Sequence, residues 1–455
     1  MKLVHRVVLA VIAGGLLGLT ALPVGIKMVG WIALVPLLIS IDKTKWWEAF
    51  LLGMLTGIFY FSIGFYWLAV YSKQAFIISL LITSGFIGLF CLFVQLLQPR
   101  LHMWYKFLFP PLVWASLAYV FSFTPFDSYW THFAEPQLIY LLQIIAITGM
   151  AGLTFMMVMS NSIVASYILS KKKNERKVIV IAGAILIAII FISLLYGAIN
   201  LKNDVSGDVS VAVVQPNFPN DVEWRKKHVE EIFKVYEELI LKAKEADIIV
   251  LPQYTWPVSV STTSRILKNL SRITDSYITI GTYRGYVNIA ILFSKEGELV
   301  GEYVAVNKPP FRNQTPGHEY VVLDSGMGNL GMLLCYDTTD EKIAREFVRN
   351  DAQVLVSMAN DNVFLGTTEP EQHLEQDILR AVENRRYIVR AAPSGISAII
   401  DPYGRIVNRS EIGKRQVLFG SVKLMNEKTI FTQIGHIFSP LALVALLVMY
   451  VMRRK

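Results

Sequence analysis

Long apolar segments alternate with short polar ones through the first two hundred residues, and one more apolar segment stands near the end of the chain. They cover residues 7–24, 26–41, 50–71, 75–98, 104–124, 137–169, 178–199 and 430–452. Most reach the roughly 20 residues that a helix needs to cross the hydrocarbon region of a bilayer. The pattern therefore predicts about eight transmembrane helices, seven before a polar stretch and one after it.

Between about Val205 and Val422 the apolar positions follow the shorter periods of a soluble domain. Buried-strand patterns occur at 209–214, 248–251, 277–283, 289–293, 298–306, 330–335 and 354–357, and near Ile388 and Ile396. Helical periodicity runs over 224–246, 339–350 and 370–386. Strands that alternate with helices and then hairpins predict an α/β domain with stacked sheets. We expect a membrane domain at 1–202, an α/β domain at 203–426, and a last transmembrane helix with a basic tail at 427–455.

Composition and charge agree with a membrane protein. The chain is 54% hydrophobic, has a mean hydropathy of +0.46 and carries a formal charge of +8. Its basic residues gather in alternate loops: Lys2 and Arg6, Lys43 and Lys45, Arg100 and Lys106, 171–177, and 453–455. Because positive residues favour cytoplasmic loops, both termini are expected in the cytoplasm and the α/β domain outside it. This distribution explains the basic charge without a nucleic-acid partner, and no phosphate-loop or zinc-type spacing calls for a cofactor or metal.

The chemistry is expected at Cys335, where the apolar run from Gly331 ends and a turn through Tyr336 and Asp337 begins. A cysteine at the end of a buried strand is well placed to act as a nucleophile, although it could equally be a buried inert thiol. A lysine can hold a thiolate and stabilise a developing oxyanion, and Lys308 is the lysine upstream of this turn. Taken alone, Lys308 could also be a solvated loop residue.

Ordered motifs along the whole chain resemble those of the apolipoprotein N-acyltransferase family, whose outward-facing domain belongs to the carbon-nitrogen hydrolase, or nitrilase, superfamily. They are Gly64-Phe-Tyr-Trp-Leu68, Val214-Gln-Pro-Asn-Phe-Pro219 followed by Trp224, Lys308, Glu319, Cys335-Tyr336-Asp337, Asn360-Asp361 with Phe364 and Gly366, Arg380-Ala-Val-Glu383 with Arg386, and Gly395-Ile-Ser. The resemblance implies a four-layer αββα domain. It also implies a ping-pong reaction, in which a phospholipid acyl chain passes through a cysteine thioester to the N-terminal amine of a diacylglyceryl-cysteine lipoprotein.

The resemblance also assigns roles to residues. Cys335 would be the nucleophile, Lys308 the catalytic lysine and Glu319 the second glutamate, with support from Trp224, Tyr336, Asp337 and Asn360. It implies a protein of the cytoplasmic membrane that acts on membrane lipid and a lipoprotein, here expected to be a monomer without a cofactor.

The chain departs from the family pattern at Gln253, which stands where the family has its general-base glutamate. An amide can orient a thiol but cannot take its proton, so either Glu319 or Asp337 serves as base, or turnover is impaired. The segment between Lys308 and Cys335 is also shorter than in the family. Two alternatives therefore stay open: a lipid- or lipopeptide-binding scaffold that has lost turnover, and an amidase acting outside the membrane.

Overall fold

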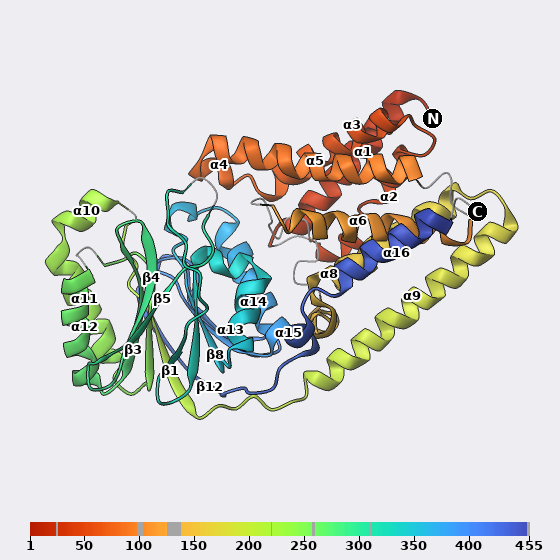
Figure 1. The fold of residues 1–455 in the computed structure, drawn as a ribbon. Helices are drawn as coiled ribbons and strands as arrows, with labels where there is room; N and C mark the ends of the chain where they lie inside the picture. Colours follow the sequence, from red (N-terminus) through yellow and green to blue (C-terminus); the bar gives the residue numbers. More distant parts are fainter. Residues whose placement is uncertain are drawn as a thin grey trace. The chain divides into compact units, whose positions relative to one another are not determined.

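The structure is a computed structural model that describes residues 1–23, 26–97, 103–124, 138–219, 221–256, 260–309 and 312–452. It divides into two compact units (Figure 1). We call them the helical unit, Met1–Leu201 with His436–Lys455, and the α/β unit, Lys202–Gly435. Of the residues on which the predicted orientation depends, Arg100 and 453–455 lie outside the described residues.

The helical unit contains the long apolar segments apart from residues 430–435, which belong to the α/β unit. Its elements are α1 (Leu3–Ala21), η1 (Lys27–Trp31), α2 (Val35–Ser40), α3 (Trp46–Gly64), α4 (Leu68–Tyr71), α5 (Lys73–Leu97), η3 (Met103–Leu108), α6 (Phe109–Phe121), α7 (Ile139–Leu142), α8 (Ile145–Leu169), α9 (Lys173–Asn200) and α16 (Phe438–Met452). Helices α1, α3, α5, α8 and α9 are long and apolar enough to cross a membrane. Three shorter apolar stretches accompany them, at Lys27–Ser40, Lys106–Phe121 and Phe438–Met449. The number of spans stays a prediction.

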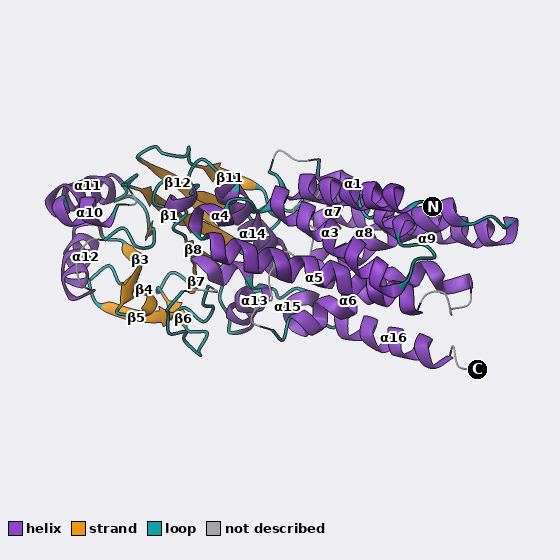
Figure 2. Cartoon of the chain, turned by 90° about the horizontal axis from the view of Figure 1, so that it is seen from above, coloured by secondary structure: helices purple, strands orange, loops and turns teal. Residues whose placement is uncertain are grey.

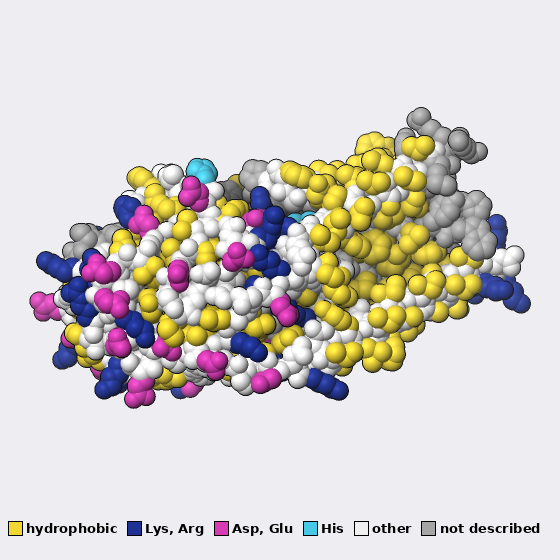
Figure 3. Space-filling view, turned by 60° about the horizontal axis from the view of Figure 1, so that its bottom comes forward, with side chains coloured by type: hydrophobic (Ala, Val, Ile, Leu, Met, Phe, Trp, Pro, Cys, Tyr) yellow, Lys and Arg dark blue, Asp and Glu magenta, His cyan; other side chains and the backbone are white. Residues whose placement is uncertain are grey.

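Small residues let the helices of this unit approach closely. A Cβ on Gly57 of α3 would lie 2.4 Å from Cα of Ser84 in α5, and one on Gly14 of α1 would lie 2.5 Å from the Thr56 carbonyl oxygen of α3. Such contacts are typical of helices that pack within a bilayer. Helix α9 instead leaves most of its apolar side chains exposed, with Ile187 at 68%, and hydrophobic side chains cover the visible face of this unit (Figure 3). These surfaces suit contact with lipid.

The α/β unit is built on two six-stranded sheets. Its strands are β1 (Val209–Gln215), β2 (Ile248–Leu251), β3 (Tyr277–Arg284), β4 (Val287–Phe293), β5 (Leu299–Val304), β6 (Val322–Asp324), β7 (Asn329–Leu334), β8 (Val354–Met358), β9 (Tyr387–Ala391), β10 (Ala398–Ile400), β11 (Ile406–Arg409) and β12 (Gln416–Val422). The strand orders are β12-β1-β2-β3-β4-β5 and β11-β10-β9-β8-β7-β6. Strands β1, β2 and β3 run parallel, as do β7, β8 and β9.

Helices cover the outer face of each sheet (Figure 2). They are α10 (Val222–Lys227), α11 (Val229–Lys242) and α12 (Val260–Thr274) on the first sheet, with α13 (Glu341–Arg349) and α14 (Glu369–Asn384) on the second; η5 (Cys335–Thr339), η6 (Asn362–Phe364) and α15 (Ile430–Ile434) complete the unit. Alternation along β1 explains the layers, because side chains two residues apart share a face. Val211 and Val213 join the core between the sheets, whereas Ala212 and Val214 pack with α11. The predicted four-layer αββα arrangement is present.

The structure also differs from the sequence pattern in places. The helix predicted over 224–246 is divided at His228 (φ −114°, ψ 32°), whose Nδ1 lies 2.7 Å from the Trp224 carbonyl oxygen. The apolar segment 430–452 is divided at Gly435 (φ 67°), where a Cβ would lie 2.7 Å from the Arg345 guanidinium carbon. Helix α12 and strands β6, β11 and β12 were not predicted.

Candidate functional site

Cys335 stands at the sharp turn between β7 and η5. Its φ of 48° is a left-handed conformation that costs a non-glycine residue on the order of 1–3 kcal/mol. The hydroxyl of Thr338 donates to the Cys335 carbonyl oxygen (3.1 Å), and His373 Nε2 lies 3.2 Å from the same oxygen. The backbone is therefore held in a strained geometry, and Cys335 as a whole residue is half-buried.

Asp337 anchors this turn. Its fully buried carboxylate accepts hydrogen bonds from the backbone N–H groups of Leu334 (2.9 Å) and Asn307 (3.0 Å) and from the Tyr303 hydroxyl (3.0 Å). Burial raises the pKa of Asp337 to about 7, although the three donors favour its ionised form. Both carboxylate oxygens are already engaged, so Asp337 is placed to shape the turn rather than to face the thiol.

The loop that carries Lys308 is attached to the same turn. Besides the N–H of Asn307 on Asp337, the Asn307 side-chain amide donates to the Tyr336 carbonyl oxygen (3.1 Å). Lys308 is exposed and Tyr336 is half-buried. The structure thus brings the predicted lysine segment against the cysteine turn while leaving the ammonium group in solvent.

Burial dominates the electrostatics of the nucleophile. It raises the pKa of the Cys335 thiol to about 12, and the negative charge of Asp361 raises this pKa further. The guanidinium of Arg312 and a hydrogen bond from the Asn360 backbone N–H act in the opposite direction. The thiolate is therefore scarce at neutral pH, and its formation needs help from a base or from the substrate.

Gln253 follows β2 and is completely buried. A Cβ on Gly281 would lie 3.0 Å from both the Gln253 and the Leu334 side chains, which places Gln253 close to the strand that ends at Cys335. Within the part of the chain that the structure describes, neither Oε1 nor Nε2 of Gln253 has a hydrogen-bond partner. A buried amide without a partner costs roughly 1–3 kcal/mol.

A buried ionic network lies beneath the cysteine turn. Arg390 binds Asp361 (2.7 Å) and Asp377 (2.6 Å), and Asp361 also binds Nδ1 of His373 (2.8 Å). Burial alone would raise the pKa of Asp361, but the charges of Arg390 and His373 bring this pKa below its usual value. Burial and the charge of Asp361 raise the pKa of Glu369 well above its usual value, which favours a neutral acid.

Asp361, Glu369 and His373 also form a possible metal-binding group, because their ligand atoms lie within 4.8 Å of one another. Arg390 already supplies the positive charge beside Asp361, and both ring nitrogens of His373 have hydrogen-bond partners. A metal ion would have to displace these contacts. The arrangement fits a closed ionic network better than a metal centre.

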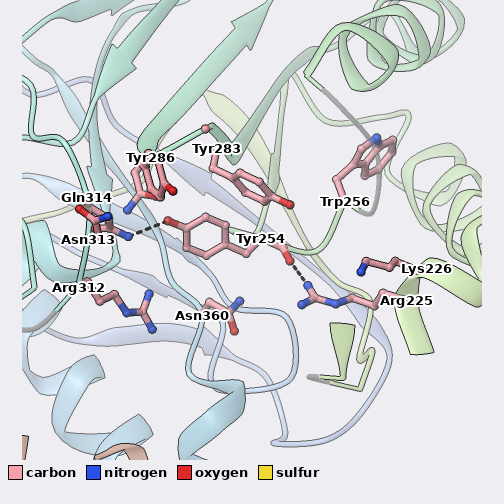
Figure 4. A pocket seen from close by; sticks show the side chains of 12 residues that line it. Arg225, Lys226, Tyr254, Trp256, Tyr283, Tyr286, Arg312, Asn313, Gln314 and Asn360 are labelled. Carbon is pink, nitrogen blue, oxygen red and sulfur yellow. Dashed lines mark hydrogen bonds between the residues drawn. The ribbon is translucent and has the colours of Figure 1, made fainter. Parts of the chain in front are cut away.

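A pocket of about 400 Å³ has a lining of cationic, amide and aromatic side chains (Figure 4). It is lined by Arg225, Lys226, Tyr254, Trp256, Tyr283, Gly285, Tyr286, Asn288, Arg312, Asn313, Gln314 and Asn360. The Asn360 backbone N–H and the Arg312 guanidinium both lower the pKa of the Cys335 thiol, and burial, followed by a negative charge on Cys335, raises the pKa of Tyr254. These links place the pocket next to the thiol.

The other predicted site residues are Glu319 and Trp224. Glu319 is exposed. Trp224 is half-buried, and its ring stacks on His228 at 4.2 Å, while its neighbours Arg225 and Lys226 line the pocket. Sequence reasoning missed the cations and tyrosines of the pocket, because they come from loops and strand ends without a periodic signal. It also missed His373, whose helical spacing from Glu369 was the available signal.

Two family models match the chain. The model described as "Apolipoprotein N-acyltransferase N-terminal domain" matches residues 13–163, and the model described as "Carbon-nitrogen hydrolase" matches residues 210–428. Together they cover most of both units, and they confirm the resemblance that the motifs predict.

Similar proteins match over nearly their full length. An apolipoprotein N-acyltransferase of Geobacter metallireducens is 28% identical over 95% of this chain and 92% of its own. One from Rickettsia bellii is 26% identical over 87% of this chain and 88% of its own. Among solved structures, Saccharomyces cerevisiae Nit3, a nitrilase superfamily member, is 20% identical with a TM-score of 0.41, over 48% of this chain and 91% of its own.

Proposed function

The chain belongs to the family of apolipoprotein N-acyltransferases, and from this premise we propose that it moves an acyl chain from a phospholipid to the N-terminal amine of a diacylglyceryl-cysteine lipoprotein. In the first step the Cys335 sulfur attacks the ester carbonyl carbon. The ester C–O bond breaks, and the lysophospholipid oxygen leaves with the proton that the thiol gives up. In the second step the lipoprotein amine attacks the thioester, so an amide forms and the thiol regains a proton.

The proposal assigns separate roles to the residues around the turn. Lys308 stabilises the oxyanion of each tetrahedral intermediate, and Glu319, Trp224, Tyr336 and Asn360 support the bound substrates. Asp337 holds the turn through its three hydrogen bonds. The observation that carries the proposal is the strained Cys335 turn, with an N–H group directed at the sulfur and a pocket beside it.

The same proposal places the protein in the cytoplasmic membrane as a monomer. Both termini would lie in the cytoplasm and the α/β unit outside it. The exposed apolar helices support a membrane location, since five of them are long enough to cross a bilayer. Both substrates carry acyl chains, so a protein that remains in the bilayer meets them without extracting them into water.

The test is a labelled thioester. Purified protein in non-ionic detergent is incubated with a phospholipid that carries a radiolabelled acyl chain, and the label on the denatured protein is challenged with hydroxylamine. We expect hydroxylamine-sensitive label on Cys335, none in Cys335→Ala, and transfer of the label to a diacylglyceryl-cysteine peptide. No label in either the natural chain or Gln253→Glu, with both folded, would refute the proposal.

Gln253 supports a second candidate function. Because this buried amide cannot accept a proton, the chain could bind lipid or lipopeptide as a scaffold without turnover. In the same experiment a scaffold retains lipid that remains extractable after denaturation, and Cys335→Ala does not change the amount bound. An amidase is disfavoured by the extensive apolar helices, which small soluble amides do not require.

A further inference from the structure

Three cationic side chains line the pocket beside Cys335. Arg225, Lys226 and Arg312 line it, and none of the described lining residues is acidic. Lys226 pairs with Glu223 at 2.8 Å, but both side chains of this pair are mostly exposed, so the attraction is weak. The pocket therefore has a positive field that favours an anionic ligand.

Tyr254 lies between the cationic side chains of the pocket and has hydrogen bonds at both its backbone and its hydroxyl. The Arg225 guanidinium donates to the Tyr254 carbonyl oxygen, and the Tyr254 hydroxyl accepts from Gln314 Nε2 (3.3 Å). In Figure 4, Arg225 and Lys226 lie toward one end of the Tyr254 side chain, whereas Arg312 lies nearer the other end, beside Asn360. The Tyr254 backbone has a φ of 58°, so this residue is held in a left-handed conformation in the middle of the pocket.

We propose that this pocket binds the phosphate of the acyl donor's headgroup, with Arg312 as its principal ligand; the assignment rests on the proposed function. Guanidinium groups bind phosphate through paired, charge-assisted hydrogen bonds. Only the glycerol carbons separate the ester that Cys335 attacks from the phosphate of the same lipid. Arg312 acts on the Cys335 sulfur and lines the pocket, so it is within reach of both ends of that short link.

Other parts of the substrates fit this pocket poorly. An acyl chain can pack on the aromatic rings of the pocket, but it would also cover the guanidinium and amide groups, which then lose contact with water. The protonated amine of a lipoprotein would enter a positive field. A volume of about 400 Å³ is within the range of small-molecule sites and suits a compact polar headgroup.

The first experiment compares two acyl donors that differ only in the phosphoglycerol headgroup. The rate of thioester formation on Cys335 is measured with dioleoyl phosphatidylglycerol and with dioleoylglycerol, for the natural chain, Arg312→Ala, Arg312→Lys and Arg284→Ala. We expect Arg312→Ala to lower the ratio of the two rates about tenfold to a hundredfold, the size of a lost hydrogen bond to a charged group. Arg312→Lys should recover part of this loss, because it restores charge without the planar fork.

Arg284→Ala is the matched control, since it removes one exposed cation of the same unit that pairs with Glu302 and does not line the pocket. It should leave the ratio unchanged. Arg312 also affects the thiol pKa, so the second experiment, which involves no thiol chemistry, measures headgroup binding separately from that effect. An unchanged ratio in Arg312→Ala would overturn the assignment.

The second experiment needs no chemistry, so it separates failure of this proposal from failure of the proposed function. Glycerophosphoglycerol, the soluble headgroup without acyl chains, is titrated calorimetrically into the full chain in non-ionic detergent. We expect binding to the natural chain and to Cys335→Ala, and an affinity about tenfold to a hundredfold lower in Arg312→Ala only. Absence of binding, or equal affinity for inorganic phosphate, would overturn the assignment to a lipid headgroup. Headgroup binding without any thioester would count against the acyltransferase function alone.

Discussion

Replacing Gln253 by glutamate should turn a passive buried amide into a general base. Gln253→Glu changes one NH₂ group to an oxygen and keeps the shape of a side chain that is completely buried. A positioned base typically accelerates a proton transfer by about 10²–10⁴-fold, equivalent to about 3–5 kcal/mol of barrier. The Cys335 thiol, whose pKa burial raises to about 12, is the group that such a base would assist.

The assay is the single-turnover rate of thioester formation between pH 5 and pH 9. Because burial without a partner disfavours a charged carboxylate, the new glutamate should have a raised pKa. A base works only when ionised, so the gain over the natural chain should be small at pH 5 and grow as the pH rises through that pKa. Gln253→Glu combined with Cys335→Ala should give no label at any pH.

Two results would refute this reasoning. One is a rate for Gln253→Glu equal to that of the natural chain over the whole pH range, in protein with an unchanged melting temperature. The other is an equal acceleration in Gln253→Ala, because a methyl group accepts no proton and the gain would then come from removal of the amide. Melting curves in the same detergent identify variants that fail to fold.

Three further outcomes are expected. Gln253→Met should raise the melting temperature by about 2–8 °C in a thermal melt, because it removes a buried amide that has no hydrogen-bond partner among the described residues and therefore costs roughly 1–3 kcal/mol. In a Cys91→Ala background, alkylation of Cys335 should rise about tenfold per pH unit from pH 7 to pH 10, because burial and then Asp361 raise its pKa to about 12; a plateau near pH 9 would contradict this. Burial raises the pKa of Asp337 from 3.8 to about 7, so between these pH values the folded protein keeps a proton that the unfolded chain loses. The free energy of unfolding should therefore fall by at most about 4 kcal/mol as the pH rises from 4 to above 7. Asp337→Asn should abolish that part of the pH dependence, measured as the difference between the two melting series.

The periodicity of the apolar positions predicted the stacked sheets of the α/β unit, but it did not predict the edge strands β6, β11 and β12. Strand β1 has both faces buried, and its parallel neighbour β2 has the same continuous apolar pattern. Strand β11 is short and mostly exposed, so its apolar pattern is weak. The helix break at His228 depends on a side chain that contacts the preceding turn, which periodicity does not report. Secondary structure was thus predictable wherever burial imposes a period.

Part of the candidate site could likewise be predicted from the sequence, and part of it could not. Cys335 and Asn360 follow parallel strands β7 and β8, and Gln253 follows β2, so their places at strand ends could be read from the sequence. The contacts of Asp337 could not, because its donors include Asn307 and Tyr303, about thirty residues away along the chain. Long-range partners of this kind leave no local pattern.

The electrostatics of Cys335 show why the identity of residue 253 matters to the whole mechanism. A thiol with a pKa of about 12 is ionised in on the order of one molecule in 10⁵ at pH 7, equivalent to about 7 kcal/mol. The charge of Arg312 lowers the thiol pKa, but a phosphate bound to Arg312 would neutralise that charge and raise the thiol pKa again. Free thiolate therefore becomes scarcer when the donor lipid binds. The proton must then leave as the sulfur attacks, and the leaving lysophospholipid oxygen is the acceptor that the reaction itself provides. Because the buried amide of Gln253 accepts no proton, the reaction depends on direct proton transfer from the thiol to the leaving oxygen. The position of the bound headgroup sets where that oxygen lies, so it affects the chemical step as well as binding.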